Sequence, residues 1–275
     1  MVNINNCTVF VNSCDRYEEA WKPFFALFHE YWPDCPYEIV LATETKTCSE
    51  KGVRTINTGN GEWTTRVQTA LRQVNTKYIL FFLEDFFLLR PVKSDKLKEV
   101  FSYMEADDNI AVFYFNRIAG RGDKSEKYPG YYDMNKKVIV EYQLNCQVAL
   151  WRKEVLEAAT SYPCNPWEFE VKGYNHVNDF VKTKEYYCSI DTYNDAIRPD
   201  DIFSYFVTMQ RGIGIARSHW LWNNKKLFRE HNIDCKCETL KNMSLLEYIF
   251  TFWREEKWRE FKRFAYPLYK ILFKR

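Results

Sequence analysis

The sequence has no long apolar run and no excess of charge of one sign. Its first apolar run, residues 9–11, is too short for a signal peptide, and no stretch reaches the roughly 20 apolar residues of a membrane-spanning helix. With 39 Lys and Arg against 37 Asp and Glu, the net charge of +2 gives no support to nucleic-acid binding. We expect a protein without a leader, a membrane span or a nucleic-acid partner.

Several catalytic motifs are also missing. There is no Gly-Lys-Ser/Thr phosphate loop and no nucleophile elbow, which disfavours a kinase or an α/β-hydrolase. The nine cysteines are scattered and odd in number, which favours reduced thiols in a cytoplasm. Cys235 and Cys237 form the closest pair, but the second pair that a zinc site would need is absent.

What the chain does contain is a large apolar and aromatic share. Its 275 residues suffice for one large α/β domain or two small ones, and 46% of them are hydrophobic, as in a globular protein. Aromatic residues make up 18%. We expect most of them in the core, although Trp and Tyr also suit contacts with sugar rings or a membrane interface.

The first half of the chain alternates strand and helix patterns. Apolar runs bounded by turn residues predict strands, and apolar residues at helical spacing predict helices. The expected strands are residues 7–11, 37–41, 53–56, 78–83 and 110–115, and the expected helices are residues 17–32, 63–74 and 94–104. This order predicts the α/β class, with a mostly parallel sheet flanked by helices.

The second half is less regular. Residues 118–135 have the composition of a long surface loop, residues 138–151 contain one or two strands, and residues 153–159 form a short helix. From Ser244 onward, apolar residues at helical spacing alternate with Lys and Arg. Such a helical tail resembles one that lies on anionic lipid, but it could equally pack on its own domain or on a second subunit.

Polar side chains follow three of the expected strands, at the edge where open α/β sheets bind ligands. The first strand leads to Ser13, Asp15 and Arg16, and the third leads to Trp63 and Arg66. The fourth runs directly into Glu84 and Asp85; these seven residues are the candidate ligand-binding set.

Glu84 and Asp85 are the most informative of these residues. Two adjacent carboxylates after a buried strand need positive compensation, and a divalent cation shared with phosphates would supply it. The metal would be Mn²⁺ or Mg²⁺, which also neutralises a departing nucleoside diphosphate. The alternative is that the two acids only begin a loop or cap a helix.

A second group of polar and aromatic residues has the sequence NPWEFE at residues 165–170. Trp167 can stack on a sugar ring, and Glu168 or Glu170 can accept a proton from an attacking hydroxyl. The alternative is a helix start, with Pro166 in the first position and acids near the positive end of the helix dipole.

Five motifs, in order and spacing, resemble one family. They are SCDRY at 13–17, YWPDCPY at 31–37, Trp63 with Arg66, YIL at 78–80 leading to EDFF at 84–87, and NPWEFE at 165–170. Together they look like bacterial glycosyltransferases of lipopolysaccharide or capsular polysaccharide assembly. The resemblance extends to about residue 222.

The resemblance implies a GT-A-like, Rossmann-like fold with a C-terminal helical extension, a nucleotide-sugar donor and a glycan or lipid-linked oligosaccharide acceptor. GT-A enzymes usually carry an Asp-X-Asp metal motif at this strand end, whereas this chain reads Leu83-Glu84-Asp85 without a second Asp. Asp85 is the preferred metal ligand, with Glu84 as its helper or as a contact to the ribose. The family pattern also implies an inverting transfer with Glu170 as the base and Glu168 in reserve.

We expect three parts along the chain: a donor-binding half at residues 1–115, an acceptor-binding half of the same domain at 116–240, and the basic tail at 241–275. The expected location is the cytoplasm, with the tail on the inner face of the membrane. Two other functions stay open. A non-catalytic carbohydrate-binding protein would explain the aromatics but not two acidic sites. A sugar nucleotidyltransferase usually has a Gly-rich loop after its first strand, and residues 12–17 contain no Gly.

Overall fold

The chain divides into two compact units, Met1–Tyr205 and Phe206–Arg275. The computed structural model describes residues 6–116, 118, 122–137, 140–189, 202–205, 214–216, 218–221, 223–235 and 237–250. Each unit is described by itself below. The tail beyond residue 250, which the sequence predicts to be helical, lies outside the described residues.

The first unit is built on one large sheet. Within the described residues it has nine strands in the order β3-β2-β1-β4-β8-β5-β9-β7-β6. Their bounds are β1 Cys7–Asn12, β2 Glu38–Thr43, β3 Val53–Asn57, β4 Tyr78–Leu83, β5 Ile110–Tyr114, β6 Asp123–Lys124, β7 Tyr131–Asp133, β8 Ala149–Arg152 and β9 Glu185–Ser189. Strands β1 to β4 are parallel to one another, whereas β8 runs antiparallel to both β4 and β5. The sheet is therefore mixed, and its β3-β2-β1-β4 half is wholly parallel.

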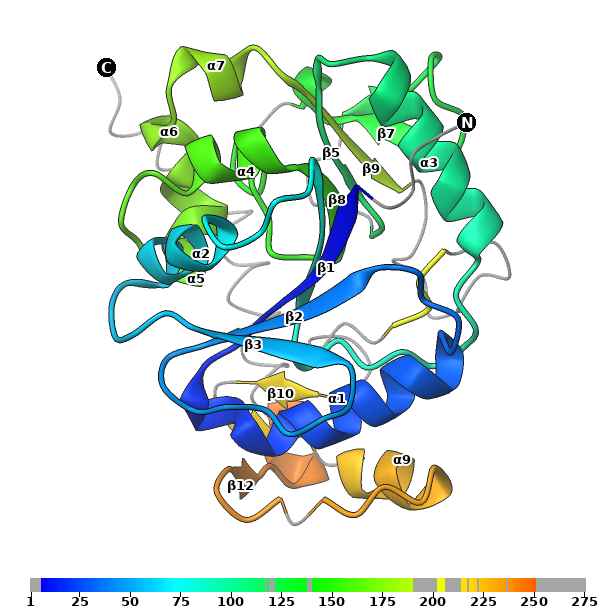
Figure 1. The fold of residues 1–275 in the computed structure, drawn as a ribbon, viewed down its shortest axis with the longest axis vertical. Helices are drawn as coiled ribbons and strands as arrows, with labels where there is room; N and C mark the ends of the chain where they lie inside the picture. The colour runs from blue at the N-terminus through cyan, green and yellow to red at the C-terminus, as the bar shows by residue number, and fades with distance from the viewer. Residues whose placement is uncertain are drawn as a thin grey trace. The chain divides into compact units, whose positions relative to one another are not determined.

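Helices cover both faces of this sheet. The longer ones are α1 Glu18–Tyr31, α2 Trp63–Leu71, α3 Ser94–Ala106 and α4 Lys153–Ala159, and the short ones are α5 Pro166–Glu168, α6 Tyr174–His176 and α7 Asp179–Lys182. Figure 1 shows α1 and α3 on one side of the sheet and α2 with α4 to α7 on the other. The predicted α/β class, a large sheet flanked by helices, is confirmed.

Strand β4 shows why the sheet needs two helical layers. Its side chains alternate between faces, so Phe82 packs on Phe24 of α1 with ring centroids 6.0 Å apart, while Phe81 packs on Trp63 of α2 at 6.4 Å. A strand buried on both faces reads as a continuous apolar run rather than an alternating one. This explains the sequence YILFFL and the exact agreement of β4 with its predicted bounds.

The structure departs from the sequence expectations in the middle of the chain. The loop expected at residues 118–135 contains β6 and β7, which reach the sheet through the pairing of β7 with β9. Of residues 138–151, expected to contain one or two strands, 149–151 belong to β8, whereas the described residues 140–148 contain turns and bends and no strand. Tyr142 there has a positive φ of 59° and donates its backbone N–H to the Glu170 carbonyl at 2.6 Å. The pairing of β7 with β9 and the hydrogen bond from Tyr142 to Glu170 both join residues far apart in the sequence, so the local pattern of apolar residues does not predict them.

The described residues of the second unit form a small sheet and two helical stretches. Strands β10 Ile215–Ala216, β11 His219–Trp220 and β12 Lys241–Asn242 form the sheet, and α9 spans Asn224–Glu230. The buried side chain of Asn224 exchanges two hydrogen bonds with the backbone of Gly214. Residues 245–250 are helical, as predicted, and Ser244 and Glu247 bond reciprocally at their start.

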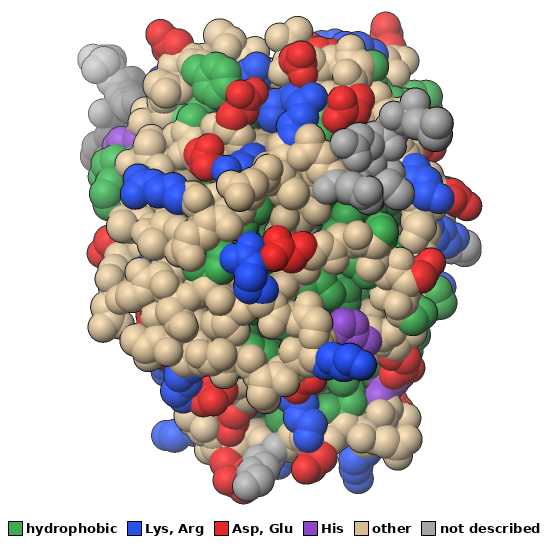
Figure 2. All heavy atoms as spheres, in the orientation of Figure 1, with side chains coloured by type: hydrophobic (Ala, Val, Ile, Leu, Met, Phe, Trp, Pro, Cys, Tyr) green, Lys and Arg blue, Asp and Glu red, His purple; other side chains and the backbone are tan. Residues whose placement is uncertain are grey.

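The described surface mixes charges of both signs. Figure 2 shows Lys and Arg side chains intermingled with Asp and Glu on the face in view, in keeping with the net charge of +2. In the described part of the chain, no helix has both the length and the apolar character needed to cross a bilayer.

Candidate functional site

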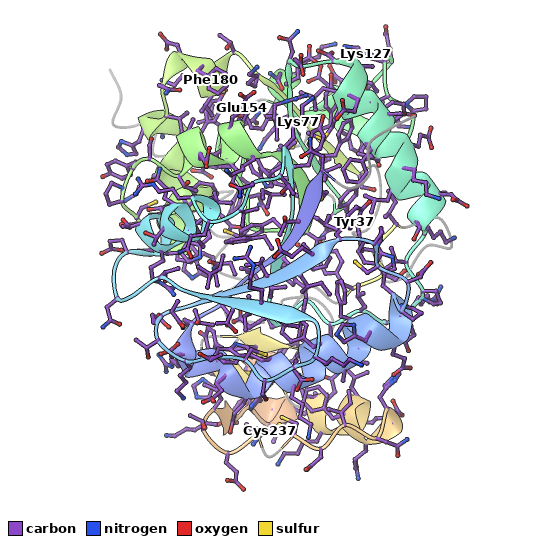
Figure 3. All side chains as sticks on the ribbon, viewed as in Figure 1. Tyr37, Lys77, Lys127, Glu154, Phe180 and Cys237 are labelled. Atoms are coloured by element: carbon purple, nitrogen blue, oxygen red, sulfur yellow. The ribbon has the colours of Figure 1, made fainter. Side chains whose placement is uncertain are left out.

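The order of strands reverses between β1 and β4, and this locates the candidate site. In open α/β sheets, ligands bind outside the carboxyl ends of the strands at such a point. Asn12 of β1 pairs with Leu83 of β4, so Ser13 and Glu84 leave the sheet side by side. The opposite edge lies at Lys77, which Figure 3 labels at the beginning of β4. Ser13 and Glu84, which the sequence singled out, thus lie at the carboxyl edge of the sheet, and their role in ligand binding stays a prediction.

Glu84 and Asp85 are both buried, with exposures of 5% and 8%. Burial and the neighbouring charge of Asp85 raise the pKa of Glu84 well above its usual range. A side-chain hydrogen bond from Ser13 and the charge of Arg66 pull that pKa down, but they do not outweigh burial. The pair is thus a site where additional positive charge would be stabilising.

Arg66 supplies the positive charge already present. It lies in the first turns of α2 and is 8% exposed. Its Nη1 is 3.1 Å from Glu44 Oε1, and it also donates to the carbonyl of Ser13 at 3.1 Å. Arg66 therefore joins the ends of β1 and β2 to the acidic pair. Glu44 was missed from the sequence, although it follows β2 as Asp15 follows β1.

Asp15 turns toward the loop after β2. Its Oδ1 accepts from the backbone N–H groups of Glu44, Thr45 and Lys46, each at 3.1 Å, and its Oδ2 accepts from the Thr45 hydroxyl at 2.6 Å. Burial raises the pKa of Asp15, but these hydrogen bonds outweigh it and the net shift is downward. In this structure the carboxylate holds the loop, and a direct contact with a donor stays a prediction.

Cys14 and Arg16 flank Asp15 in different surroundings. Burial, with the charges of Glu84 and Glu44, raises the pKa of the Cys14 thiol to about 12, so it stays protonated and weakly nucleophilic. Arg16 is exposed and forms no ion pair or hydrogen bond with any described residue. Its guanidinium is therefore available to an anionic ligand.

Trp63 connects the acidic pair to the second candidate segment. Its ring is 7% exposed and lies 6.4 Å from the Phe81 ring of β4 and 5.2 Å from the Phe169 ring. Its buried indole N–H has no hydrogen-bond partner in the described structure. Trp63 thus packs between the two parts of the site, and the predicted role in donor binding stays a prediction.

Glu170 lies in a turn of π-helix, Phe169–Gly173. Such turns are rare and occur frequently at functional sites. Glu170 Oε1 accepts the backbone N–H of Cys146 at 2.9 Å. Burial raises the pKa of Glu170 to about 7, even though hydrogen bonds from Cys146 lower it. A carboxyl that titrates near neutrality is suited to general-base catalysis.

Trp167 and Glu168 precede this turn in the single-turn helix α5. Asn165 Oδ1 accepts the Glu168 backbone N–H at 3.0 Å, and Glu168 Oε2 accepts the Asn165 backbone N–H at 3.3 Å, so together they form a capping box with Pro166 in the first turn. The sequence interpretation of this segment as a helix start is therefore confirmed. Trp167 is 63% exposed and free to stack on a ligand.

The structure thus brings Ser13, Arg66, Glu84 and Asp85 together and adds Glu44 to them. Among the described residues, no three or more His, Cys, Asp or Glu side chains form a group that could hold a metal by themselves. A nucleotide-bound Mg²⁺ or Mn²⁺ needs only one or two protein carboxylates, because phosphates and water complete its shell. The two adjacent buried carboxyl groups, of which Glu84 has its pKa raised by burial and by Asp85, fit a cation held in that way.

Comparisons with protein-family models and with curated proteins give no match. Several solved structures show a partial likeness to this chain. Staphylococcus aureus TarS 1-349 is 15% identical, with 68% of this chain and 58% of that chain covered and a TM-score of 0.43. The mannosyltransferase PcManGT from Pyrobaculum calidifontis, solved with GDP-Man and Mn²⁺, is 14% identical over 60% of this chain and 50% of that chain, with a TM-score of 0.41. A cytidylyltransferase from Leptospira borgpetersenii is 14% identical over 60% of this chain and 68% of that chain, with a TM-score of 0.40.

The chain spans 58% of the length of the TarS fragment. With identities of 14 to 15% and TM-scores no higher than 0.43, these likenesses concern the fold and say nothing about the reaction. A functional assignment has to come from the residues at the carboxyl edge of the sheet.

Proposed function

We propose that this chain is a nucleotide-sugar glycosyltransferase of the GT-A type that transfers a sugar to a glycan acceptor. One observation carries the proposal. At the switch point of the sheet, the buried carboxyl of Glu84, whose pKa is raised by burial and by the charge of Asp85, lies within reach of the charge of Arg66. A separate carboxyl, Glu170, titrates near pH 7 on a π-helical turn. Two acidic sites with different environments suit two different roles.

The donor side is formed by the ends of β1 and β4. Asp85, with Glu84, would hold a divalent cation shared with the donor's diphosphate, and that cation would neutralise the charge of the leaving group. The exposed guanidinium of Arg16 is placed to bind a phosphate or the ribose side of the donor. Ser13 and Arg66 keep Glu84 in position at the strand end.

The acceptor side is formed by α5 and the π-helical turn. The Glu170 carboxylate takes the proton of the acceptor hydroxyl while that oxygen attacks the anomeric carbon of the donor sugar. The bond from this carbon to the diphosphate breaks, and the configuration inverts. Trp167, exposed on a turn that the Asn165 cap fixes, offers its ring face to the acceptor glycan.

The sequence resemblance and the second unit support a proposal about the acceptor and about where it is met. A lipid-linked oligosaccharide in surface polysaccharide synthesis is the proposed acceptor, reached from the cytoplasmic side of the membrane. The helical residues 245–250 expose large apolar side chains, Leu246 at 79% and Phe250 at 64%, and the sequence that follows is basic and aromatic. Apolar side chains followed by cationic residues suit the surface of an anionic membrane.

The test is a panel of nucleotide sugars, assayed for transfer to water and to glycan acceptors with and without Mn²⁺. With the sugar that the wild type uses, Glu170→Gln should reduce turnover at least about 100-fold and leave donor affinity unchanged, because a base contributes roughly 10²- to 10⁴-fold. Glu168→Gln is the matched control, because Gln keeps an acceptor for the capping box, and it should stay close to wild type.

The outcomes separate the three candidate functions. Near-normal turnover of the Glu170→Gln enzyme would remove Glu170 from the mechanism. Release of pyrophosphate from a nucleoside triphosphate and a sugar phosphate would identify a nucleotidyltransferase. Glycan binding without cleavage of any nucleotide sugar would identify a carbohydrate-binding protein.

A further inference from the structure

The segment Asn145-Cys146-Gln147 lies between the two acidic parts of the site. Strand β8 is antiparallel to β4, and its first residue, Ala149, pairs with Phe81. The residues that lead into β8 therefore run beside those that leave β4 toward Glu84. From the middle of this segment, the backbone N–H of Cys146 donates to Glu170 at 2.9 Å.

Gln147 connects the segment to the residues beyond the acidic pair. Its Oε1 accepts from the Tyr205 hydroxyl and from Asn116 Nδ2, both at 3.1 Å. The Tyr205 ring lies 5.1 Å from that of Phe86, the residue after Asp85. The segment is thus anchored to both sides of the site, by a main-chain contact to Glu170 and by a side-chain contact toward Asp85.

Both amides of the segment use their oxygens and leave their nitrogens unused. Asn145 Oδ1 accepts the backbone N–H of Gln147 at 2.9 Å, and Gln147 Oε1 has the two donors above. Neither Asn145 Nδ2 nor Gln147 Nε2 has a hydrogen-bond partner in the described part of the chain. Asn145 is only 6% exposed, and a buried amide donor without a partner is costly.

These two nitrogens are nevertheless not sealed from solvent. The described polar side-chain atoms that are both fully buried and unpaired belong to other residues; they are His29 Nε2, Trp32 Nε1, Trp63 Nε1, Tyr78 Oη and Asn223 Oδ1. The amide nitrogens of Asn145 and Gln147 therefore border a space that water or a ligand can enter. Neutral donors next to an acidic pair suit hydroxyl groups better than phosphates, which call for positive charge.

We propose that Asn145 Nδ2 and Gln147 Nε2 donate hydrogen bonds to hydroxyl groups of the donor sugar and contribute to the choice of sugar. This inference rests on the proposed function. In a direct displacement, the anomeric carbon lies between the leaving phosphate and the attacking hydroxyl. The transferred sugar must therefore lie between the acidic pair and Glu170, where this segment is. A site that donates to sugar hydroxyls rejects analogues that lack them.

Two isosteric variants remove the donors and keep the acceptors. Asn145→Asp retains the oxygen that accepts the Gln147 N–H, and Gln147→Glu retains the oxygen that accepts from Tyr205 and Asn116. The matched control is Asn178→Asp, because Asn178 Oδ1 also accepts a backbone N–H, that of Val181 at 3.1 Å, from an exposed position at the start of α7. All three variants introduce one negative charge.

The measurement is calorimetric binding of the nucleotide sugar that wild type uses and of its bare nucleoside diphosphate. Dividing the dissociation constant of the nucleoside diphosphate by that of the nucleotide sugar gives the gain in affinity due to the sugar. Because both ligands carry the diphosphate, repulsion between the diphosphate and the new carboxylate affects both constants and cancels in this ratio. Asn145→Asp and Gln147→Glu should each lower this ratio about tenfold, as expected for the loss of one hydrogen bond between the protein and a neutral sugar hydroxyl. Asn178→Asp should leave the ratio unchanged.

The other outcomes overturn the inference. If both variants keep the wild-type ratio of dissociation constants, the two amides do not bind the sugar. The same follows if wild type binds the nucleotide sugar no more tightly than the nucleoside diphosphate. In either case the proposed function stands. If wild type binds and cleaves no nucleotide sugar, the proposed function fails and takes this inference with it. Nucleoside diphosphate binding by each variant shows that its site is still folded.

Discussion

Glu170 has an environment that its position in the sequence does not suggest. The motif NPWEFE contains two acids, and sequence alone cannot tell which is solvated and which is buried. The structure separates them, since Glu168 completes a capping box at the exposed start of α5 and Glu170 enters the π-helical turn. The π-turn itself has no recognisable sequence signature, so the pKa of Glu170 was beyond prediction.

The pKa of Glu170 predicts opposite effects of pH on activity and on stability. Its ordinary value of 4.5 is raised to about 7 in the folded chain. Activity that needs the carboxylate should rise tenfold per pH unit up to about pH 7 and then level off. Between these two pKa values the folded chain holds a proton that the unfolded chain has released, so this group's contribution to stability falls as pH rises.

Denaturant unfolding of wild type and Glu170→Gln from pH 4 to 9 measures the second effect. The Gln variant should gain stability over wild type as pH rises, with the gain levelling off above pH 7 at up to about 3 kcal/mol, from 1.36 kcal/mol per pKa unit. A difference independent of pH would show that Glu170 titrates normally. The pH dependence of kcat/KM, measured on wild type, should have its acid limb at the same pH.

At the scale of elements, strands buried on both faces were the most predictable. β1, β2 and β4 are continuous apolar runs because helices cover both sides of the sheet, and their predicted bounds agree with the structure to within two residues. β7, Tyr131–Asp133, is half-exposed and joins the sheet only through β9, more than fifty residues further along the chain. A strand defined by such a partner leaves no local periodicity to detect.

The element that presents Glu170 is short and depends on its cap. Asn165→Ala removes the side-chain oxygen that accepts the Glu168 backbone N–H and should cost about 1 kcal/mol in the free energy of unfolding. Asn178→Ala removes the equivalent cap of α7, where the Asn178 side chain accepts from Val181, and should cost a similar amount. Only Asn165→Ala should also lower kcat, by about tenfold, because α5 continues directly into the π-helical turn.

Denaturant titration and steady-state kinetics of the two variants provide the comparison. Because both variants lose a helix cap and a similar amount of stability, a lower kcat of Asn165→Ala than of Asn178→Ala cannot come from the loss of stability alone. The difference between the two kcat values therefore measures the effect on Glu170. Equal values of kcat in both variants would show that α5 does not position the base.

At the scale of the whole chain, the sequence predicted a division that the structure draws at another place. The boundary between compact units falls after Tyr205, whereas the predicted parts were divided by ligand at residues 115 and 240. The structural boundary separates two groups of residues that pack mainly among themselves, whereas the predicted boundaries separate parts expected to bind different ligands. Strands from both sides of residue 115 share the sheet of the first unit, so no gap in packing marks that limit, and the ligand assigned to each part stays a prediction.

The second unit carries the prediction about the membrane. Leu246→Glu with Phe250→Glu replaces two exposed apolar side chains at the start of the tail and should reduce flotation with anionic vesicles more than tenfold, because each side chain contributes roughly 1.5–3 kcal/mol when buried. Gln73→Glu with Asn175→Glu adds the same two charges at exposed positions of the first unit and should float as wild type does. Equal flotation of both full-length double variants would exclude residues 246 and 250 from membrane contact.

The segment before β8 also has a consequence for how such proteins diverge. Cys146 holds Glu170 through its main-chain N–H, a contact that any residue except proline can make. The side chains of Asn145 and Gln147 take no part in that contact, and substitutions that keep their acceptor oxygens leave the segment anchored. If these amides bind the sugar as proposed, such substitutions are open to selection for a new sugar, whereas an insertion or deletion between them would displace Glu170. Descendants of this chain should differ in the side chains at 145 and 147 and agree in the length of the segment.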